Sequence, residues 1–179
     1  MQSERMLTFG GCARPDSNMP SFETSRLVPH SAQDMFRLVA DVEQYPKFLP
    51  LCTGLTVRTR DVDGQGREVL IANMSVGYKA IRERFTSRVT LDRENMEILV
   101  EYIDGPFSHL ENRWTFAATG ESAHNTKVGF SIEYEFKRRA LALVMGAVFE
   151  RAFRHFAEAF EKRADEIYGN ASPVAAGAG

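Results

Sequence analysis

The feature that most constrains the fold of this chain is an unbroken amphipathic segment near its end, from Ala140 to Tyr168. Large apolar residues recur in it at steps of three and four, and charged residues occupy the positions between, which is typical of a long α-helix with one buried face. At about 1.5 Å per residue, such a helix would be about 43 Å long. It is long enough to cross a whole small sheet, so the residues before it are expected to form that sheet.

Residues 55–136 have the sequence pattern of such a sheet. Apolar and polar residues alternate with period two, most clearly where Val128, Phe130 and Ile132 are separated by small or charged residues. Turn sequences at 63–66, 104–106 and 120–122 favour antiparallel hairpins over crossover connections. The prediction is an α+β fold in which a curved antiparallel sheet wraps around the long C-terminal helix. Such a shape leaves room for an apolar guest between helix and sheet.

A shorter helix is expected before the hairpins. Residues 22–28 are predicted as a first strand and residues 32–41 as a helix, with Ser31 as its N-cap and Asp34 completing a variant capping box. One face of this helix is expected to pack on the sheet. Its residues are Met35, Phe36, Val39 and Val42.

Two prolines stiffen the segment that follows this helix. Pro46 and Pro50 bracket a short turn that carries Tyr45 and Phe48. A stiff aromatic segment of this kind can form the mouth of an apolar cavity at little ordering cost, and a plain connection packed on the core is the alternative. Lys47 is expected in water or against an anionic lipid or a partner protein.

The two ends of the chain are predicted to lie outside the fold. Residues 1–18 mix Gly, Pro, Ser and charged residues without periodicity, which indicates a disordered extension or a start codon assigned too early. A transit peptide is the alternative, although Glu4 and Asp16 are unusual in one. Residues 170–179 are expected to form a disordered tail, so one domain is predicted over residues 19–169.

The composition argues against several function classes. With 22 Lys and Arg against 24 Asp and Glu, no global positive field exists to attract DNA. Cys12 and Cys52 are the only cysteines, which predicts neither a disulfide framework nor a metal-binding cluster and favours a reducing compartment. No stretch approaches the roughly 20 apolar residues that span a bilayer, so membrane contact is expected to be peripheral.

Several motifs together resemble the coenzyme Q-binding branch of the START-like polyketide cyclase/dehydrase superfamily, over residues 20–168. They are YPKFLP at 45–50, RERFTSRV at 82–89, Gly-Pro-Phe at 105–107 followed by Leu110, Asn112, Trp114 and Phe116, and the long C-terminal helix. The resemblance implies a helix-grip fold that binds ubiquinone without catalysis and supports respiratory electron transport. It also implies a cytoplasmic protein of a bacterium, at the periphery of the inner membrane or in contact with a respiratory complex.

The same branch includes a ribosome-association toxin, which binds the large ribosomal subunit and blocks subunit joining. This is the alternative function that the resemblance implies. Arg82, Arg84 and Arg88 alternate along one predicted strand and are expected to project from one face. They form either a contact for a polyanion such as ribosomal RNA or a solvated face of mixed charge.

A tunnel between the helix and the sheet is the predicted ligand site. For each residue taken singly, ordinary core packing is the alternative. Gly146, inside the long helix, suggests close approach by the sheet or by a ligand. The predicted ligand-binding residues are Tyr45, Phe48, Leu49, Pro50, Phe85, Phe107, Trp114, Phe116, Phe130, Ile132, Tyr134, Val144, Met145, Val148 and Phe149.

An enzyme such as a cyclase or dehydratase would need polar groups that converge in this tunnel. Glu83 has the strand parity of Phe85 and is the candidate acid or base, with an ion pair to a neighbouring Arg such as Arg113 as the alternative. The histidines do not fall at metal-ligand spacings. No catalytic residue and no metal site is therefore predicted.

Overall fold

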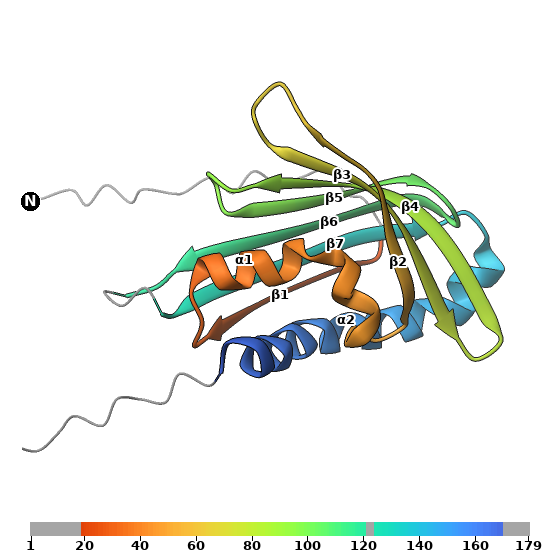
Figure 1. Cartoon of the computed structure of the whole chain (residues 1–179). Helices are drawn as coiled ribbons and strands as arrows, with labels where there is room; N and C mark the ends of the chain where they lie inside the picture. Colours follow the sequence, from red (N-terminus) through yellow and green to blue (C-terminus); the bar gives the residue numbers. More distant parts are fainter. Residues whose placement is uncertain (1–18, 121–123, 170–179) are drawn as a thin grey trace, which may run out of the picture.

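The period-two segments form one antiparallel sheet of seven strands in the order β1-β7-β6-β5-β4-β3-β2. The computed structural model describes residues 19–120 and 124–169 (Figure 1), and the extension and tail predicted at 1–18 and 170–179 lie outside the described residues. In chain order the elements are β1 Ser21–Val28, α1 Ala32–Ala40, the 3-10 helix η1 Val42–Lys47, β2 Cys52–Val62, β3 Glu68–Tyr78, β4 Ile81–Asp92, β5 Glu97–Asp104, β6 Phe107–Ala118, β7 Thr126–Phe136 and α2 Arg139–Tyr168.

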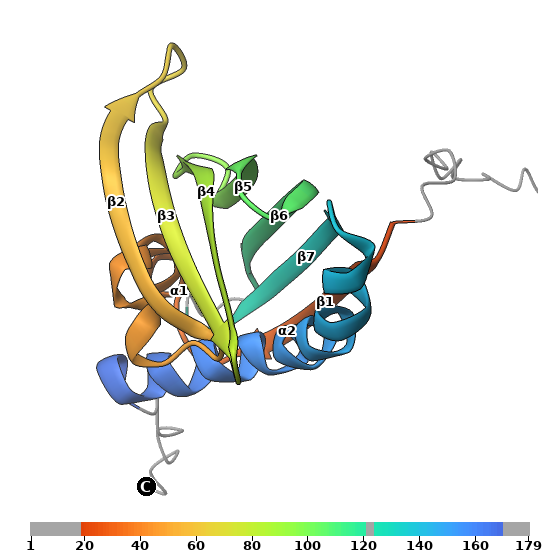
Figure 2. The same ribbon diagram turned by 90° about the vertical axis from the view of Figure 1, so that its right-hand side faces the viewer.

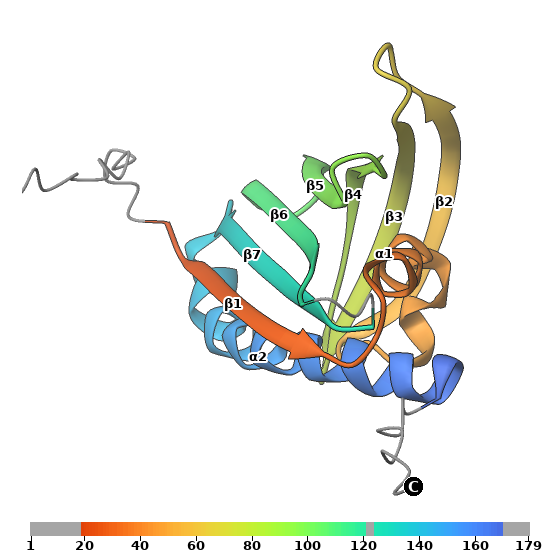
Figure 3. The same ribbon diagram turned by 90° about the vertical axis from the view of Figure 1, so that its left-hand side faces the viewer.

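The sheet is strongly curved, and α2 runs across its open side (Figures 2 and 3). All neighbouring strands pair antiparallel. Helices α1 and η1 carry the chain from β1 at one edge of the sheet to β2 at the other edge. The predicted α+β arrangement of a curved antiparallel sheet around a long C-terminal helix is confirmed.

Helix α1 begins as its sequence predicts. The Ser31 hydroxyl accepts a hydrogen bond from the Asp34 backbone N–H at 3.1 Å and donates one to Asp34 Oδ2 at 2.7 Å, which satisfies one of the free N–H groups of the first turn. Met35, Phe36 and Val39 are buried, as predicted. This face fixes α1 against the inner side of the sheet and so positions the segment that follows it.

Helix α2 buries one face along most of its length, and Gly169, at a φ of 76°, ends it. Full burial of one large apolar side chain contributes about 1.5 to 3 kcal/mol as an upper estimate, so this face is a main source of the stability of the fold. Its buried residues are Met145, Phe149, Ala152, Phe153, Phe160 and Ala164.

Two expectations for the first turns of α2 are wrong. Val144 is expected inside but is 55% exposed, because Met145 occupies the inward position and successive helical residues point about 100° apart. Gly146 is expected at a close approach, yet a Cβ atom at this position would meet no other atom within 4 Å. The glycine is therefore not required by packing in this structure.

Candidate functional site

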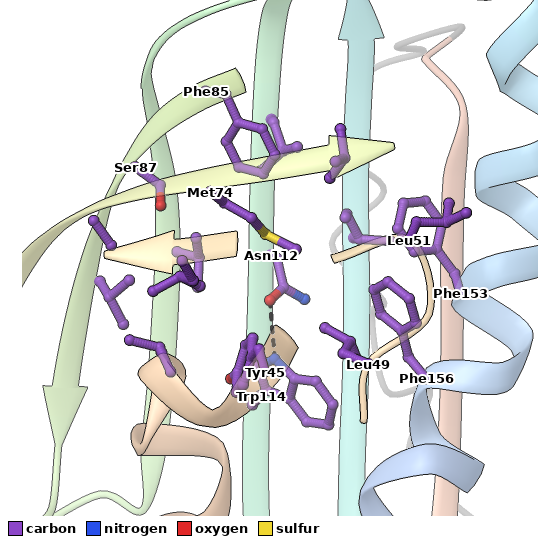
Figure 4. Close-up of a pocket in the computed structure, with 18 of the residues that line it drawn as sticks. Tyr45, Leu49, Leu51, Met74, Phe85, Ser87, Asn112, Trp114, Phe153 and Phe156 are labelled. Carbon is purple, nitrogen blue, oxygen red and sulfur yellow. Dashed lines mark hydrogen bonds between the residues drawn. The ribbon is translucent and has the colours of Figure 1, made fainter. Parts of the chain in front are cut away.

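An apolar cavity of about 100 Å³ lies between the concave face of the sheet, the connection from η1 to β2, and α2 (Figure 4). Its wall is aliphatic and aromatic except for three polar side chains, and none of the charged residues that the structure describes contributes to it. The predicted ligand-binding residues that the structure places in this wall are Tyr45, Leu49, Pro50, Phe85, Phe107, Trp114, Phe130, Ile132 and Phe149.

The structure places the other predicted residues outside this wall. Strand or helix parity identifies a residue that faces the interior, but it does not say whether that residue borders the empty volume or another side chain. Val144 is exposed, and Val148 lines a separate groove. The predicted residues that pack in or against the surrounding core instead are Phe48, Phe116, Tyr134 and Met145.

Sequence reasoning missed several residues of the wall. The aromatic residues of α2 after Phe149 share its helical face, so extending that stripe would have found them. The polar residues of the wall carry no such signal, because a polar side chain on the inner face of a strand breaks the alternation. The missed residues of the wall include Leu51, Met74, Ser87, Asn112, Phe153, Phe156 and Phe160.

Two of the polar side chains in the wall form hydrogen bonds within the protein. The Tyr45 hydroxyl donates to the Val39 carbonyl oxygen at 2.5 Å, and burial raises the pKa of Tyr45 far above its usual value. Asn112 Oδ1 accepts a hydrogen bond from Trp114 Nε1 at 2.9 Å, and Asn112 Nδ2 donates to the Ser131 carbonyl oxygen at 2.8 Å. Tyr45 and Asn112 therefore hold the wall together.

Ser87 on β4 is the third polar side chain of the wall. It is only 4% exposed, and Figure 4 shows its hydroxyl oxygen beside the cavity. Within residues 19–120 and 124–169 its hydroxyl forms no hydrogen bond. Ser87 therefore has hydrogen-bonding capacity that the folded chain does not use.

In the part of the chain that the structure describes, the cavity wall has no carboxylate, histidine, lysine, arginine or cysteine side chain. Burial raises the pKa of the Cys52 thiol to about 11, so the reactive thiolate is disfavoured at neutral pH. Glu83 does not contribute to the cavity wall. Arg113, suggested as an ion-pair partner for Glu83, instead pairs with Glu97 at 2.7 Å and with Glu111 at 3.5 Å. Among the described residues, no three metal-ligating side chains come together.

In the same ranges, no helix has the length and apolar character needed to cross a membrane.

A second, open groove of about 230 Å³ lies beside the cavity, between the end of β3 and α2. Tyr78 and Val148 contribute to its apolar lining and Arg151 to its charge. Pro50 and Leu51 line both the groove and the cavity. Leu51 has a φ of 65°, a left-handed conformation that is unfavourable for a leucine. A strained two-residue segment therefore separates the cavity from the groove.

The three arginines of β4 lie on the opposite, outer side of the sheet. Arg82, Arg84 and Arg88 are exposed and alternate with inward-facing residues. The Arg82 guanidinium donates to the backbone carbonyls of Lys79, in the β3–β4 turn, and of Ile81, at the start of β4. Arg88 lies directly opposite Glu101 on β5. The outer face therefore has a basic stripe with an acidic neighbour, separate from the cavity.

Comparison with known proteins gives consistent matches across these elements. Residues 28–161 match the family described as "Polyketide cyclase / dehydrase and lipid transport". The chain is 34% identical over 163 residues to the ribosome association toxin RatA of Escherichia coli, covering 91% of this chain and 98% of that relative. It is 28% identical over 160 residues to the mitochondrial coenzyme Q-binding protein COQ10 of Dictyostelium discoideum, covering 89% and 76% respectively. Among solved structures, the 18 kDa protein CC1736 of Caulobacter crescentus superposes with a TM-score of 0.69 at 34% identity, covering 84% of this chain and 99% of that one.

Proposed function

This chain belongs to the polyketide cyclase, dehydrase and lipid transport family, and on that premise we propose that it binds a lipophilic small molecule in the cavity between sheet and α2. The observation that carries this proposal is the wall itself, which is mostly apolar and, among the described residues, holds no charged side chain. Transfer of apolar ligand surface into such a site is favourable by about 25 cal/mol per Å². The absence of convergent acid and base groups from the wall supports binding without catalysis.

Ubiquinone is our proposed ligand, supported by the similarity to the protein named as coenzyme Q-binding. The volume of about 100 Å³ is smaller than the cavity of about 150 Å³ that accommodates benzene in an engineered core. A quinone ring would therefore enter only if wall side chains move. Met74, with its flexible thioether chain, and Leu51, at the strained boundary, are positioned to do so.

The first turns of α2 support a peripheral membrane contact for this carrier. Leu143 is 81% exposed and Val144 is 55% exposed, on a stretch in which residues 140–149 carry no charge. Arg138 and Arg139 precede this stretch, and Glu150 and Arg151 follow it. The two arginines at its start can be attracted to an anionic lipid surface. The open groove borders the turns of α2 that follow, from Ala147 on, so a lipid could pass from the bilayer past Pro50 and Leu51. In this role the protein would work at the cytoplasmic face of a bacterial inner membrane and support respiratory electron transport.

Ribosome association is the second candidate function. The similarity to RatA, at 34% identity over 98% of that relative, supports it more strongly than the similarity to COQ10 supports ubiquinone. The exposed stripe of Arg82, Arg84 and Arg88 supplies a surface that can contact phosphates of ribosomal RNA. Because this stripe and the cavity lie on opposite sides of the sheet, separate variants can test the two functions.

The binding function is tested by extraction and mass spectrometry of lipid from protein purified gently from its native host. Ala72 is 2% exposed and lines the cavity, so Ala72→Leu would fill most of the free volume. Ala117 is exposed on β6, and Ala117→Leu is the matched control. We expect quinone with wild type and the control, and none with Ala72→Leu. A wild-type protein that carries no lipid, and takes up none from membrane-mimetic mixtures, contradicts the proposal.

The ribosome function is tested on sucrose gradients, from the ratio of joined ribosomes to free subunits after overexpression. Reversal of Arg82, Arg84 and Arg88 to Glu should restore subunit joining if the wild type blocks it, because repulsion replaces attraction to phosphate. An unchanged block in this variant argues against the stripe as the contact. The control carries the same charge reversals at Arg37, Arg58 and Arg154.

A further inference from the structure

Ser87 sets a chemical requirement on whatever occupies the cavity. Ser87 is buried, with 4% of its surface exposed, and its hydroxyl lies beside the empty volume (Figure 4). No residue of the described ranges accepts from it or donates to it. Because buried polar groups in native proteins are nearly always paired, an unpaired hydroxyl at a cavity points to a partner that is not part of the chain.

The other polar groups of the wall are engaged elsewhere. The Tyr45 hydroxyl donates its proton to the Val39 carbonyl oxygen. The Asn112 side chain is fixed between Trp114 Nε1 and the Ser131 carbonyl oxygen. Ser87 is therefore the hydrogen-bond donor in this wall that remains available to a ligand.

A second hydroxyl without a partner lies at the same level of the sheet. Tyr102 on β5 is the direct register partner of Ser87 on β4. The Tyr102 hydroxyl is buried and, within the described ranges, has no hydrogen-bond partner. Its ring packs edge-on against Phe107, which lines the cavity, with 5.9 Å between ring centroids. The inner face of the sheet thus carries two unused hydroxyls on paired strands.

We infer, resting on the proposed binding function, that the ligand is a neutral molecule with a hydrogen-bond-accepting oxygen, and that Ser87 donates a hydrogen bond to this oxygen atom. A fatty acid or phospholipid head is excluded from the cavity, because no side chain of the wall can neutralise a buried charge. A plain hydrocarbon fits the apolar wall but leaves Ser87 unpaired. A benzoquinone ring carries carbonyl oxygens and no charge, and it satisfies both conditions.

The inference is tested by measuring two affinities in wild type, Ser87→Ala and Ser87→Thr. Trp114 is the one tryptophan of the chain and lines the cavity, so quenching of its fluorescence by decylubiquinone reports binding directly. Decylbenzene, which has an apolar ring and the same tail but no oxygen, is titrated as a competitor that relieves the quenching. Ser75→Ala is the matched control, since Ser75 lies on β3 outside the cavity wall.

We expect Ser87→Ala to lower the affinity for decylubiquinone by about tenfold, the effect of one lost hydrogen bond, and to leave the affinity for decylbenzene unchanged. Ser87→Thr retains a hydroxyl and should retain most of the preference for decylubiquinone over decylbenzene. Ser75→Ala should have the affinities of wild type. If only a water pairs with Ser87, the ratio of the affinity for decylubiquinone to the affinity for decylbenzene should be the same in wild type and Ser87→Ala. That result would overturn the inference while leaving cavity binding intact. Failure of both ligands to bind wild type would instead contradict the proposed function, and with it this inference.

Discussion

His30 Nε2 lies 2.6 Å from Asp165 Oδ1, although the two residues are 135 positions apart in the chain. His30 occupies the turn between β1 and α1, where its side chain is 4% exposed, and Asp165 belongs to the last turn of α2. The His30 carbonyl oxygen also accepts a hydrogen bond from the Thr126 hydroxyl at 2.7 Å. The contact between His30 and Asp165 fixes the end of α2 against the turn that leads into α1.

Loss of the acceptor at position 165 should therefore destabilise the whole domain. Asp165→Leu leaves a buried imidazole nitrogen without a partner, and we expect the free energy of unfolding to fall by about 1 to 3 kcal/mol. Asp165→Asn keeps an oxygen acceptor of the same shape and should lose less. Urea unfolding followed by circular dichroism measures both values. If the two variants were equally stable, the hydrogen bond would not be the source of the effect.

The sequence predicts the fold well because its two hydrophobic periods are long and regular. The alternation of Val128, Phe130 and Ile132 predicts β7, and the stripe through Phe149 and Phe153 predicts the buried face of α2. Both patterns express a local rule, that a side chain follows the geometry of its own element. These local patterns are sufficient to predict a curved sheet around one helix.

The cavity could be predicted only in part, because it depends on which inward side chains leave a gap. Phe116 and Phe130 have the same strand signal, yet Phe116 packs against Phe36 of α1 while Phe130 borders the cavity. The position of α1 decides this difference, and it is a tertiary property. Ser87 was missed for the opposite reason, since a serine on an inward strand position weakens the pattern that identifies the strand.

Gly105 should be intolerant of any side chain. A Cβ atom there would lie 2.7 Å from Phe85 Cβ and 2.8 Å from the Arg84 carbonyl oxygen, and φ is 137°. We expect Gly105→Ala to lower the free energy of unfolding by more than about 1 kcal/mol, and also to disturb the cavity wall through Phe85. Gly120→Ala is the control, because its φ of 77° is similarly unfavourable but no atom lies within 4 Å. Equal losses in the two variants would show that backbone conformation, and not the clash, dominates.

Leu51 should control how fast a ligand leaves the cavity. Leu51→Gly relieves a left-handed conformation that costs about 1 to 2 kcal/mol for a residue with a Cβ atom, but it also removes the side chain that separates the cavity from the groove. We expect faster release of bound quinone in stopped-flow fluorescence, with little loss of stability. Met96→Gly relieves a similar φ of 53° in the turn after β4 and should leave the release rate unchanged. A release rate that rises equally in both variants would argue against a specific role of Leu51 in ligand release.

Cys52 should make the protein less stable at alkaline pH. Burial raises the pKa of its thiol to about 11, whereas an unfolded cysteine has a pKa of about 8.5. Its stabilising contribution is fully present below the unfolded pKa and is lost as pH rises through the folded pKa, because the unfolded state releases its proton first.

The burial of Cys52 can be checked separately by thiol labelling. In a Cys12→Ser background, labelling at about pH 8 should be slow in the native protein and fast in urea. Rapid labelling of the native protein would contradict the burial of Cys52.

The first turns of α2 should mediate binding to anionic vesicles. Leu143→Glu together with Val144→Glu places two charges on the most exposed apolar part of the helix, and we expect loss of most binding to vesicles of phosphatidylglycerol and phosphatidylcholine in a flotation assay. The reason is twofold, since apolar contact is lost and the new carboxylates repel the anionic surface. The control changes Leu27 and Val62, which are 65% and 70% exposed, to Glu. It adds the same charge to β1 and β2, away from the groove, so equal loss of binding in the control would show that net charge alone, and not this face of α2, determines membrane contact.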